Sequence, residues 1–325
     1  MILIGGENLM DLIAQPQMAP NLYLRAVEGG SPYNTALAAA RLGAEVGYLT
    51  PISTDAMGQR ICAHLEASGA HVLGSRVDAP TSLALVSLDA GQASYQFYRR
   101  QTAERSVSLD ALSDKLALGH ALHIGSLALT GEEDGEVWTQ LFELADQQGL
   151  FTSVDLNIRP HFVEDESNYR DRLKRVMQAA RLIKLSDEDL SWWVGRDLDH
   201  YEEQRRACLA LGRTFYPQIV FLTRGDRGAS AFFERNHKVN VLERPVTSPR
   251  IFIDTVGAGD TFMGGVLSTL GELVLSDAFF DGWNKLRIEH ALMRGSIAAS
   301  LNCEQIGCQP PTLTEVKARQ AELGL

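Results

Sequence analysis

Cysteine is scarce in this sequence, and the usual spacing of redox and metal motifs is absent. The 325 residues include four cysteines, and none of them forms a CxxC pair. A disulfide framework is therefore not expected, whereas reduced thiols in a cytoplasmic protein are. The chain also lacks an uncharged apolar run of about 18 residues, which argues against a membrane-spanning helix. The opening MILIGGENLMDLIAQ lacks a basic start and reads as a first buried strand rather than a signal peptide.

Positive charge is also in short supply. Lysine and arginine number 30 against 41 acidic residues, which gives a net charge of -11. A general nucleic-acid binder needs a basic surface that replaces phosphate counterions, so that class of partner is disfavoured. A small anionic ligand remains compatible, because a pocket can be locally positive in an acidic protein.

The two familiar nucleotide-binding motifs are missing. No Gly-Lys dipeptide occurs, which excludes a Walker A loop. The glycines at Gly257 and Gly259 are followed by Phe262 where a dinucleotide fingerprint has a third glycine, and they lie far from the first strand. An ordinary P-loop NTPase and a Rossmann dehydrogenase are both disfavoured.

Short strand-like runs alternate with helical patterns along the chain. Runs such as RLIKLS and IVFLTRG are apolar without alternation, as in strands buried on both faces. This rhythm predicts an α/β fold with a mainly parallel central sheet flanked by helices, formed by residues 1–13, 31–81 and 105–325. Residues 14–30 and 82–104 break the rhythm with strands that have no helix between them, and the second stretch turns near Asp89. We expect these two stretches to form a small β-sheet beside the main domain.

The stretch DTVGAGDTF, residues 254–262, joins the strand-like run RIFID to an apolar helical pattern. A helix N-terminus has unpaired amides, and Gly257, Ala258 and Gly259 allow an anion to approach them closely. The Asp260 carboxylate would repel a resting phosphate, but a neutral hydroxyl could lie between the carboxylate and the phosphate. Asp260 would then be the base that accepts the proton of that hydroxyl. The competing interpretation is a tight turn in which Asp260 or Thr261 only caps the helix.

DTVGAGDTF resembles the C-terminal signature of the ribokinase-like (PfkB) carbohydrate kinases. GGSPYNTALAAARLGAEVGYLTPISTDAMG, residues 29–58, resembles their N-terminal signature, and the resemblance covers essentially the whole chain. It implies an ATP-dependent sugar kinase with Mg²⁺, a small β-sheet lid over the sugar, and Asp260 as catalytic base. It also makes Gly257, Ala258 and Gly259 the anion hole.

The resemblance assigns further residues to the sugar. Asp11, Gly29, Gly30 and Asn34 match positions that bind sugar hydroxyls, a task that suits carboxylate and amide groups. In DLNIRP, residues 155–160, Asn157 and Arg159 are expected to face the site. A helix cap remains an alternative for Asn34, and a surface ion pair for Arg159.

The nucleotide side is assigned in the same way. Thr223, Arg224 and Gly225 resemble the loop that binds the ATP phosphates, and Asn302 lies in the segment that flanks adenine. A family Asn-x-x-Glu segment that organises Mg²⁺ corresponds here to Ser186 and Asp189. That departure leaves open which carboxylate among residues 187–189 supports the metal. Asp254 lies where the family has a monovalent-cation loop, so a K⁺ site and a purely structural role both fit.

The lid sequence FYRRQTAER, residues 97–105, resembles fructokinases, and fructose is the favoured substrate. Arg99 and Arg159 also suit the carboxylate of a sugar acid, so a 2-keto-3-deoxygluconate kinase is the main alternative. A non-catalytic sugar or nucleotide sensor on the same fold is the alternative from another class. Pairing of two lids would give a homodimer, which the family resemblance suggests and no local pattern establishes.

Overall fold

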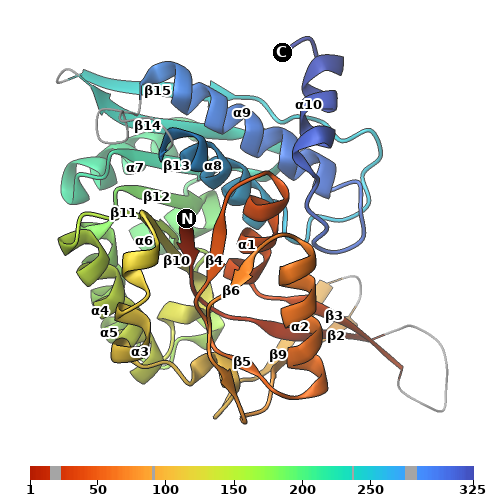
Figure 1. The fold of residues 1–325 in the computed structure, drawn as a ribbon. Coiled ribbons are helices and arrows are strands. Elements are labelled where there is room, and N and C mark those ends of the chain that lie inside the picture. Colours follow the sequence, from red (N-terminus) through yellow and green to blue (C-terminus); the bar gives the residue numbers. More distant parts are fainter. Residues whose placement is uncertain (15–22, 90–91, 236–237, 275–283) are drawn as a thin grey trace.

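In the computed structural model a large sheet is covered by helices on both faces, and a smaller sheet lies to one side (Figure 1). The structure describes residues 1–14, 23–89, 92–235, 238–274 and 284–325. In this part of the chain, no helix is long and apolar enough to cross a membrane.

The central sheet contains, among the described residues, nine strands in the order β15-β14-β13-β12-β11-β10-β1-β4-β6. The strands from β6 to β13 pair in parallel, and β14 and β15 extend one edge with antiparallel pairing. This arrangement confirms the predicted α/β class. The strands are β1 (Ile2–Ile4), β4 (Val46–Tyr48), β6 (His71–Val72), β10 (Ala121–Gly125), β11 (Phe151–Asp155), β12 (Leu182–Ser186), β13 (Ile219–Thr223), β14 (Ala229–Arg235) and β15 (Lys238–Arg244).

Two apolar layers cover the sheet because its strands carry hydrophobic side chains on both faces. In β1, Ile2 and Ile4 pack under one layer and Leu3 under the other, as the twofold alternation of a strand requires. Helices α1 (Ser31–Arg41), α2 (Ala56–Ala67), α8 (Ala258–Val274) and α9 (Lys285–Asn302) form the first layer. The second layer contains α3 (Leu109–Ser113), α4 (Glu133–Gln147), α5 (Glu166–Ala179), α6 (Asp187–Val194) and α7 (Tyr201–Phe215).

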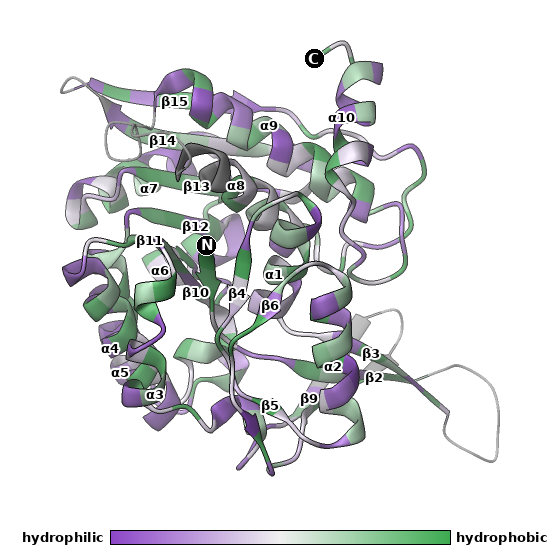
Figure 2. Ribbon diagram, in the orientation of Figure 1, coloured by the Kyte–Doolittle hydropathy of each residue, from purple (hydrophilic) through white to green (hydrophobic). Residues whose placement is uncertain are grey.

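The remaining elements are short or lie at the edge of the fold. Helix α10 (Leu313–Glu322) packs on α9, and β5 (Ile52–Ser53) pairs with β7 (Arg76–Val77). Short 3₁₀ helices span Ala103–Arg105, Leu116–Leu118, Ser126–Leu129, Pro160–Phe162 and Gly225–Arg227. In Figure 2 helices such as α2 and α9 alternate between hydrophobic and hydrophilic colours, as helices with one buried side do.

The small sheet has four strands within the described residues, in the order β3-β2-β8-β9. They are β2 (Leu9–Ala14), β3 (Leu24–Gly29), β8 (Ser82–Asp89) and β9 (Gln92–Tyr98). The two interruptions of the sequence therefore do meet in one sheet, as expected. The boundaries differ, because the sheet already begins at Leu9 and ends at Tyr98. Residues 15–22 and the turn at 90–91 lie outside the described residues.

Two expected strands have a different form. The opening run is not one strand: β1 belongs to the central sheet and β2 to the small sheet. The run RIFID before the glycine turn is an irregular loop, in which Ile251 and Phe252 are 68% and 66% exposed. Apolar composition predicted a strand there, but no neighbouring strand pairs with this loop in the described part of the structure.

Candidate active site

A cavity of about 780 Å³ lies between the small sheet and the carboxyl ends of the central strands. This is the edge at which open α/β sheets bind their ligands. The small sheet contributes Leu9, Asp11 and Phe97 to the cavity wall. The wall on the opposite side consists of Glu7, Gly30, Ser31, Asn34, Ser126, Leu127, Asn157, Arg159, His161, Phe162, Lys184, Glu188, Thr255, Val256, Gly257, Gly259 and Asp260.

A second cavity, of about 470 Å³, lies on the other side of the first turn of α8. Its wall is mainly apolar and includes Phe252, Phe262 and Ala299, with Ser300 among its few polar groups. Thr255 and Gly259 line both cavities, so the two meet at the N-terminus of α8. The geometry provides a polar chamber and an apolar chamber joined at a helix N-terminus.

Asp260 occupies the first turn of α8 and is 8% exposed. Ser31 Oγ donates a hydrogen bond of 2.7 Å to its Oδ1, and Asn34 Nδ2 donates one of 2.8 Å to its Oδ2. Burial raises the pKa of Asp260 above its ordinary value, while the hydrogen bonds from Asn34 and Ser31 oppose that shift. The carboxylate is thus held in a fixed orientation and made a stronger proton acceptor by burial.

The turn before Asp260 tolerates little besides glycine at position 257. Gly257 has a φ of 72°, and a Cβ there would lie 2.3 Å from Cys308 Sγ. Helix α8 begins at Ala258, whose N–H donates to the Thr255 carbonyl oxygen at 3.1 Å, and Gly257 and Gly259 line the polar cavity on either side of it. The predicted Gly257, Ala258 and Gly259 therefore stand together at a helix N-terminus beside Asp260.

Lys184 is a component of this junction that the sequence interpretation missed. Its ammonium forms a 2.7 Å ion pair with Asp155, and both side chains are at least 96% buried. A Cβ placed on Gly259 would lie 3.3 Å from Lys184 Nζ, which puts the cation at the start of α8. Burial alone would lower the pKa of Lys184, but Asp155, Asp189 and Asp260 outweigh it and raise that pKa. The lysine inside the apolar run RLIKLS was the available signal, because a buried strand rarely contains a lysine that lacks a charged partner.

Most of the sugar-side predictions line the polar cavity together with Asp260, and Asn34 donates directly to that carboxylate. Asp11 and Gly30 line the cavity, and burial raises the pKa of Asp11 to about 6. Gly29 lies behind the wall, where a Cβ would lie 2.4 Å from Asp11 Oδ2. Gly29 therefore makes room for the Asp11 carboxylate rather than lining the cavity itself.

Asn157 and Asp260 are connected through a second residue absent from the sequence predictions. Asn157 Nδ2 donates a 2.7 Å hydrogen bond to Ser31 Oγ, which in turn donates to Asp260. Asn157 has a φ of 35°, an uncommon backbone conformation for a residue other than glycine, and such conformations concentrate at functional sites. Arg159, the other candidate from DLNIRP, lines the same cavity.

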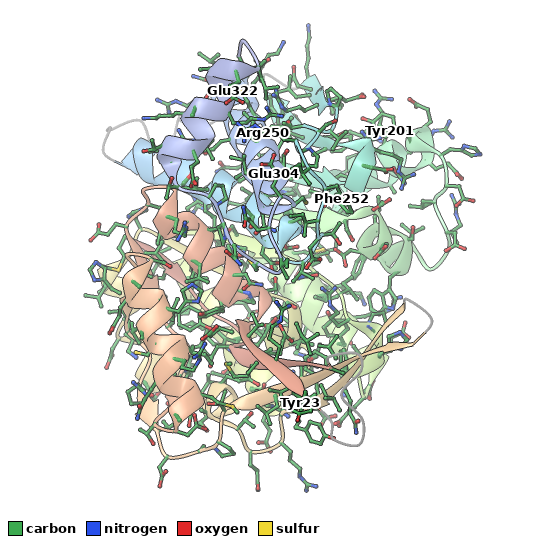
Figure 3. All side chains as sticks on the ribbon, turned by 90° about the vertical axis from the view of Figure 1, so that its right-hand side faces the viewer. Tyr23, Tyr201, Arg250, Phe252, Glu304 and Glu322 are labelled. Atoms are coloured by element: carbon green, nitrogen blue, oxygen red, sulfur yellow. The ribbon has the colours of Figure 1, made fainter. Side chains whose placement is uncertain are left out.

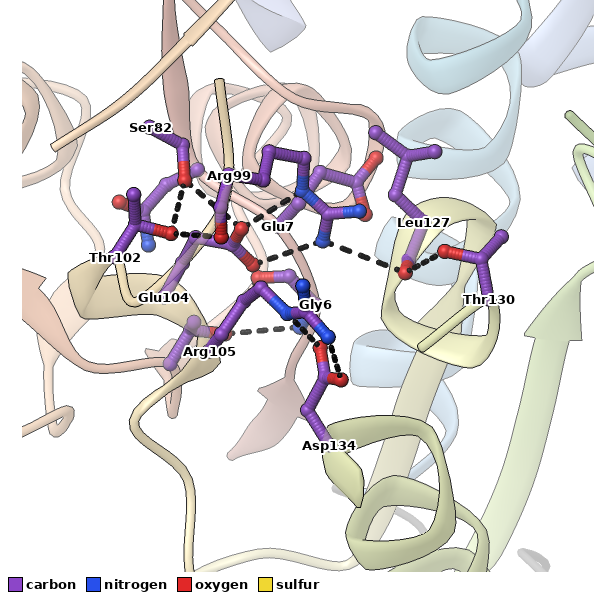
Figure 4. A network of polar contacts seen from close by, with 12 residues as sticks. Gly6, Glu7, Ser82, Arg99, Thr102, Glu104, Arg105, Leu127, Thr130 and Asp134 are labelled. Atoms are coloured by element: carbon purple, nitrogen blue, oxygen red, sulfur yellow. Dashed lines mark hydrogen bonds and ion pairs between the residues drawn. The ribbon is translucent and has the colours of Figure 1, made fainter. Parts of the chain in front are cut away.

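Arg99 has a different position from the one predicted. Its Nε and Nη2 donate to the two carboxylate oxygens of Glu104 at 2.8 and 3.1 Å, and Nη2 also reaches the Leu127 carbonyl oxygen (Figure 4). The Arg99 side chain is 11% exposed and is not part of the cavity wall. Sequence spacing could not reveal this, because the partner Glu104 follows in a 3₁₀ turn that folds back on the strand end.

Glu7 is another cavity residue that the sequence interpretation missed, and it lies beside Arg99 in Figure 4. It is 2% exposed, and its Oε1 accepts the backbone N–H of Ser31 at 3.0 Å. Burial raises the pKa of Glu7 to about 7, although Arg99 opposes the shift. An acid three residues after a buried strand, directly behind the first two glycines, was the available signal.

Replacing Glu7 with glutamine should change how stability depends on pH. The carboxyl pKa is about 7 in the folded protein and 4.5 as an ordinary glutamate, so the folded state holds the proton more tightly. The protonated Glu7 carboxyl therefore contributes to the free energy of unfolding. This contribution is fully present below about pH 4.5 and is lost as pH rises through 7, and it amounts to at most about 3 kcal/mol. Glu7→Gln should therefore gain stability relative to wild type between pH 5 and 8. Denaturant unfolding at both pH values tests this, and parallel profiles would contradict it.

The residues proposed for Mg²⁺ divide into two groups. Ser186 caps α6 in a capping box with Asp189, whose Oδ2 accepts the Ser186 N–H at 2.8 Å. Asp189 Oδ1 accepts the N–H of Ile158 at 2.6 Å, so backbone groups engage both oxygens. Glu188, in contrast, lines the polar cavity. In the described ranges, no three acidic, histidine or cysteine side chains form a metal-binding group.

The remaining nucleotide-side predictions have different surroundings. Thr223 and Gly225 line the apolar cavity, and the guanidinium of Arg224 lies 4.3 Å from the ring centre of Tyr201. Asn302 is fully buried and donates to the Val256 carbonyl oxygen at 2.8 Å, which shapes the loop before the glycine turn. Asp254 has a similar role, because its two oxygens accept the N–H groups of Val256 and Gly307.

Comparison with known proteins agrees with this geometry. The model of the pfkB family carbohydrate kinases matches residues 3–315. A fructokinase from Rhizobium leguminosarum bv. trifolii is 34% identical over 271 residues, covering 83% of this chain and 79% of the relative. A fructokinase from Klebsiella pneumoniae is 31% identical over 272 residues, covering 83% of this chain and 84% of the relative.

Among solved structures, a fructokinase from Xylella fastidiosa with bound ATP superimposes with a TM-score of 0.85 at 26% identity. The match covers 100% of this chain and 99% of that one. Together with the family match over nearly the whole sequence, these similarities establish that the chain belongs to the pfkB family of carbohydrate kinases.

Proposed function

We propose that this ATP-dependent sugar kinase phosphorylates fructose, with the sugar in the polar cavity and the nucleotide in the apolar one. The observation that carries this assignment is the position of Asp260 in the first turn of α8, where it lines the polar cavity together with Asp11 and Glu7. A hydroxyl held by these side chains would lie next to both a proton acceptor and an anion site.

The chain's own groups account for the steps of an in-line transfer. Asp260 removes the proton of the sugar hydroxyl as that oxygen attacks the γ-phosphorus of ATP, and the bond to ADP breaks on the opposite side. The amides of Gly257 and Gly259 and the Lys184 ammonium stabilise the negative charge on the transferring phosphoryl group, whereas the Ala258 amide donates to the Thr255 carbonyl oxygen. Ser31 and Asn34 hold Asp260 in the orientation needed for proton transfer.

Mg²⁺ fits the residues present at the phosphate side. This ion keeps several water ligands and is commonly bound through one or two carboxylates together with substrate phosphates. Glu188 is the carboxylate that lines the cavity and would hold it, whereas Asp189 is engaged by backbone groups. When bound, the ion would neutralise phosphate charge. For K⁺, we propose that Asp254 shapes the loop rather than binding the ion directly, because both of its oxygens accept backbone N–H groups.

Closure of the sugar cavity by the small sheet is part of the proposal. Phe97 of β9 meets Phe162 of the main domain, with ring centroids 4.5 Å apart, and both rings line the cavity. An apolar contact across the opening would exclude water and limit hydrolysis of ATP. The small sheet is thus proposed to act as a lid. Its two edge strands, β3 and β9, offer the pairing surface of the proposed homodimer.

A neutral sugar fits the charges better than a sugar acid. Arg99 is committed to Glu104, and Arg100 lines a separate hollow, so neither is a cavity residue. Glu7 and Asp11 line the cavity and, when ionised, would repel an added carboxylate. Arg159 is the arginine that remains available to an acidic substrate or to phosphate.

A substrate panel tests this proposal. ADP release should be measured with fructose, 2-keto-3-deoxygluconate, ribose and adenosine, and fructose should give the highest kcat/KM, by at least about tenfold. A higher kcat/KM with the sugar acid would overturn the fructose assignment and would indicate that Arg159 binds the substrate carboxylate. Binding of sugars without any turnover would favour a sensor instead.

The setting of the reaction is also part of the proposal. Cys62, Cys208, Cys303 and Cys308 are all free thiols in the structure. We place the enzyme in the cytoplasm, where ATP and phosphorylated sugars are retained and thiols remain reduced.

A further inference from the structure

The loop of residues 248–256 forms walls of both cavities, yet its own apolar side chains do little to hold it. Pro249, Phe252 and Thr255 line the apolar cavity, and Val256 lines the polar one. Phe252 is 66% exposed, and its neighbours on either side are also largely exposed. Because burial contributes little here, the conformation of this loop depends on its polar contacts.

Backbone hydrogen bonds connect this loop to the segment that follows helix α9. The N–H groups of Ile253 and Asp254 both donate to the Cys303 carbonyl oxygen, at 2.9 and 3.3 Å. Asn302 donates to the Val256 carbonyl oxygen, and Asp254 accepts the N–H of Gly307. Residues 302–307 therefore support the loop directly behind the glycine turn.

Ionic contacts extend this support to the C-terminal helix. Arg250 donates its backbone N–H to Glu304 at 2.8 Å, and its Nη2 donates to both carboxylate oxygens of Glu322 at 2.8 and 2.7 Å. Arg319 pairs with Glu322 at 3.0 Å and donates to the Ser248 carbonyl oxygen. Figure 3 shows Glu322, Arg250 and Glu304 in succession, with Phe252 beside them. The loop is thus attached at its start to α10 and at its end to residues 302–307.

We propose that Arg250, Glu304 and Glu322 form a clamp through which the C-terminal helix sets the affinity of the enzyme for ATP. Arg250 acts as a positioning residue, because it holds the loop that carries Phe252 and Thr255 and does not line either cavity. A free loop would sample many conformations, and the nucleotide would have to order it on binding. The clamp removes that cost in advance. This inference rests on the proposed placement of ATP in the apolar cavity.

The test compares substrate constants in clamp variants. Arg250→Gln and Glu322→Gln should each raise KM for ATP and the dissociation constant of a non-hydrolysable ATP analogue by about 3- to 10-fold. KM for fructose and kcat should stay within about twofold, since the polar cavity and Asp260 are untouched. The double variant should resemble the single ones, because both remove the same contact. Arg205→Gln, which breaks an exposed pair with Glu202 on α7, is the matched control and should change nothing.

The outcomes separate failure of the clamp from failure of the proposed function. An unchanged ATP constant in Arg250→Gln, or equal changes in both KM values and kcat, would overturn the clamp. Ser296→Phe places a ring in the apolar cavity and tests the nucleotide assignment independently. If that variant folds and still binds the ATP analogue with wild-type affinity, the nucleotide lies elsewhere. Absence of turnover with fructose in the wild type would affect only the substrate assignment.

Discussion

Asp260→Asn is expected to lower kcat by roughly 10²- to 10⁴-fold while the affinity for ATP stays close to that of the wild type. Asparagine has nearly the same shape and can keep the hydrogen bond from Ser31, but it cannot accept the proton of the sugar hydroxyl. Asn34 can rotate its amide to face the new side chain, so the local structure should survive. ADP release under saturating sugar, together with calorimetric binding of an ATP analogue, measures both quantities.

The pH profile adds a second readout for the same residue. Burial raises the pKa of Asp260, so the acid side of the wild-type kcat/KM profile should lie above the ordinary carboxyl value of 3.8. In the wild type, protonation of Asp260 should lower kcat/KM at acid pH. This fall in kcat/KM should be absent from the Asp260→Asn variant. Asp171→Asn, an exposed change on α5, is the matched control. Near-normal turnover by Asp260→Asn would remove the base assignment.

Local sequence patterns predicted the main architecture, and the failures have identifiable physical causes. Strands such as β12 and β13 are buried on both faces, so their apolar runs indicated the parallel sheet directly. RIFID has the same apolar character, but it forms a loop with exposed side chains. Polar contacts with residues 302–322 hold this loop instead of pairing with a neighbouring strand. Composition reports what a strand needs, whereas pairing depends on partners that are distant in sequence.

The candidate site shows the same division. The part of the site formed by DTVGAGDTF could be predicted from local sequence, because the glycines, the helix start and Asp260 are consecutive. Ser31 became recognisable only in three dimensions, where it receives a hydrogen bond from Asn157 and gives one to Asp260 across 229 positions of sequence. Arg99 is the opposite case, because its charge suggested a contact with substrate, whereas in the structure its guanidinium pairs with Glu104. A charged residue beside a site can serve the substrate or another side chain, and spacing alone does not distinguish these roles.

Lys184→Met should reduce kcat by about 10²- to 10³-fold, the cost of removing one preorganised group from a charge-stabilising site. Lys184 supplies a positive charge at the start of α8, where the transferring phosphoryl group would gain negative charge. The single variant also leaves Asp155 buried without its partner, which can cost about 3–5 kcal/mol of stability. Activity loss in that protein alone would therefore not distinguish catalysis from misfolding.

A second substitution resolves this ambiguity. In Lys184→Met with Asp155→Asn the buried charge is gone, so the melting temperature should recover toward that of the wild type. Asp155→Asn alone retains the ammonium at the junction and should keep most of the turnover. If Lys184 acts on the phosphoryl group, the double variant should be stable and still slow, with KM for fructose little changed. A stable double variant with wild-type kcat would show that Lys184 serves only to neutralise Asp155.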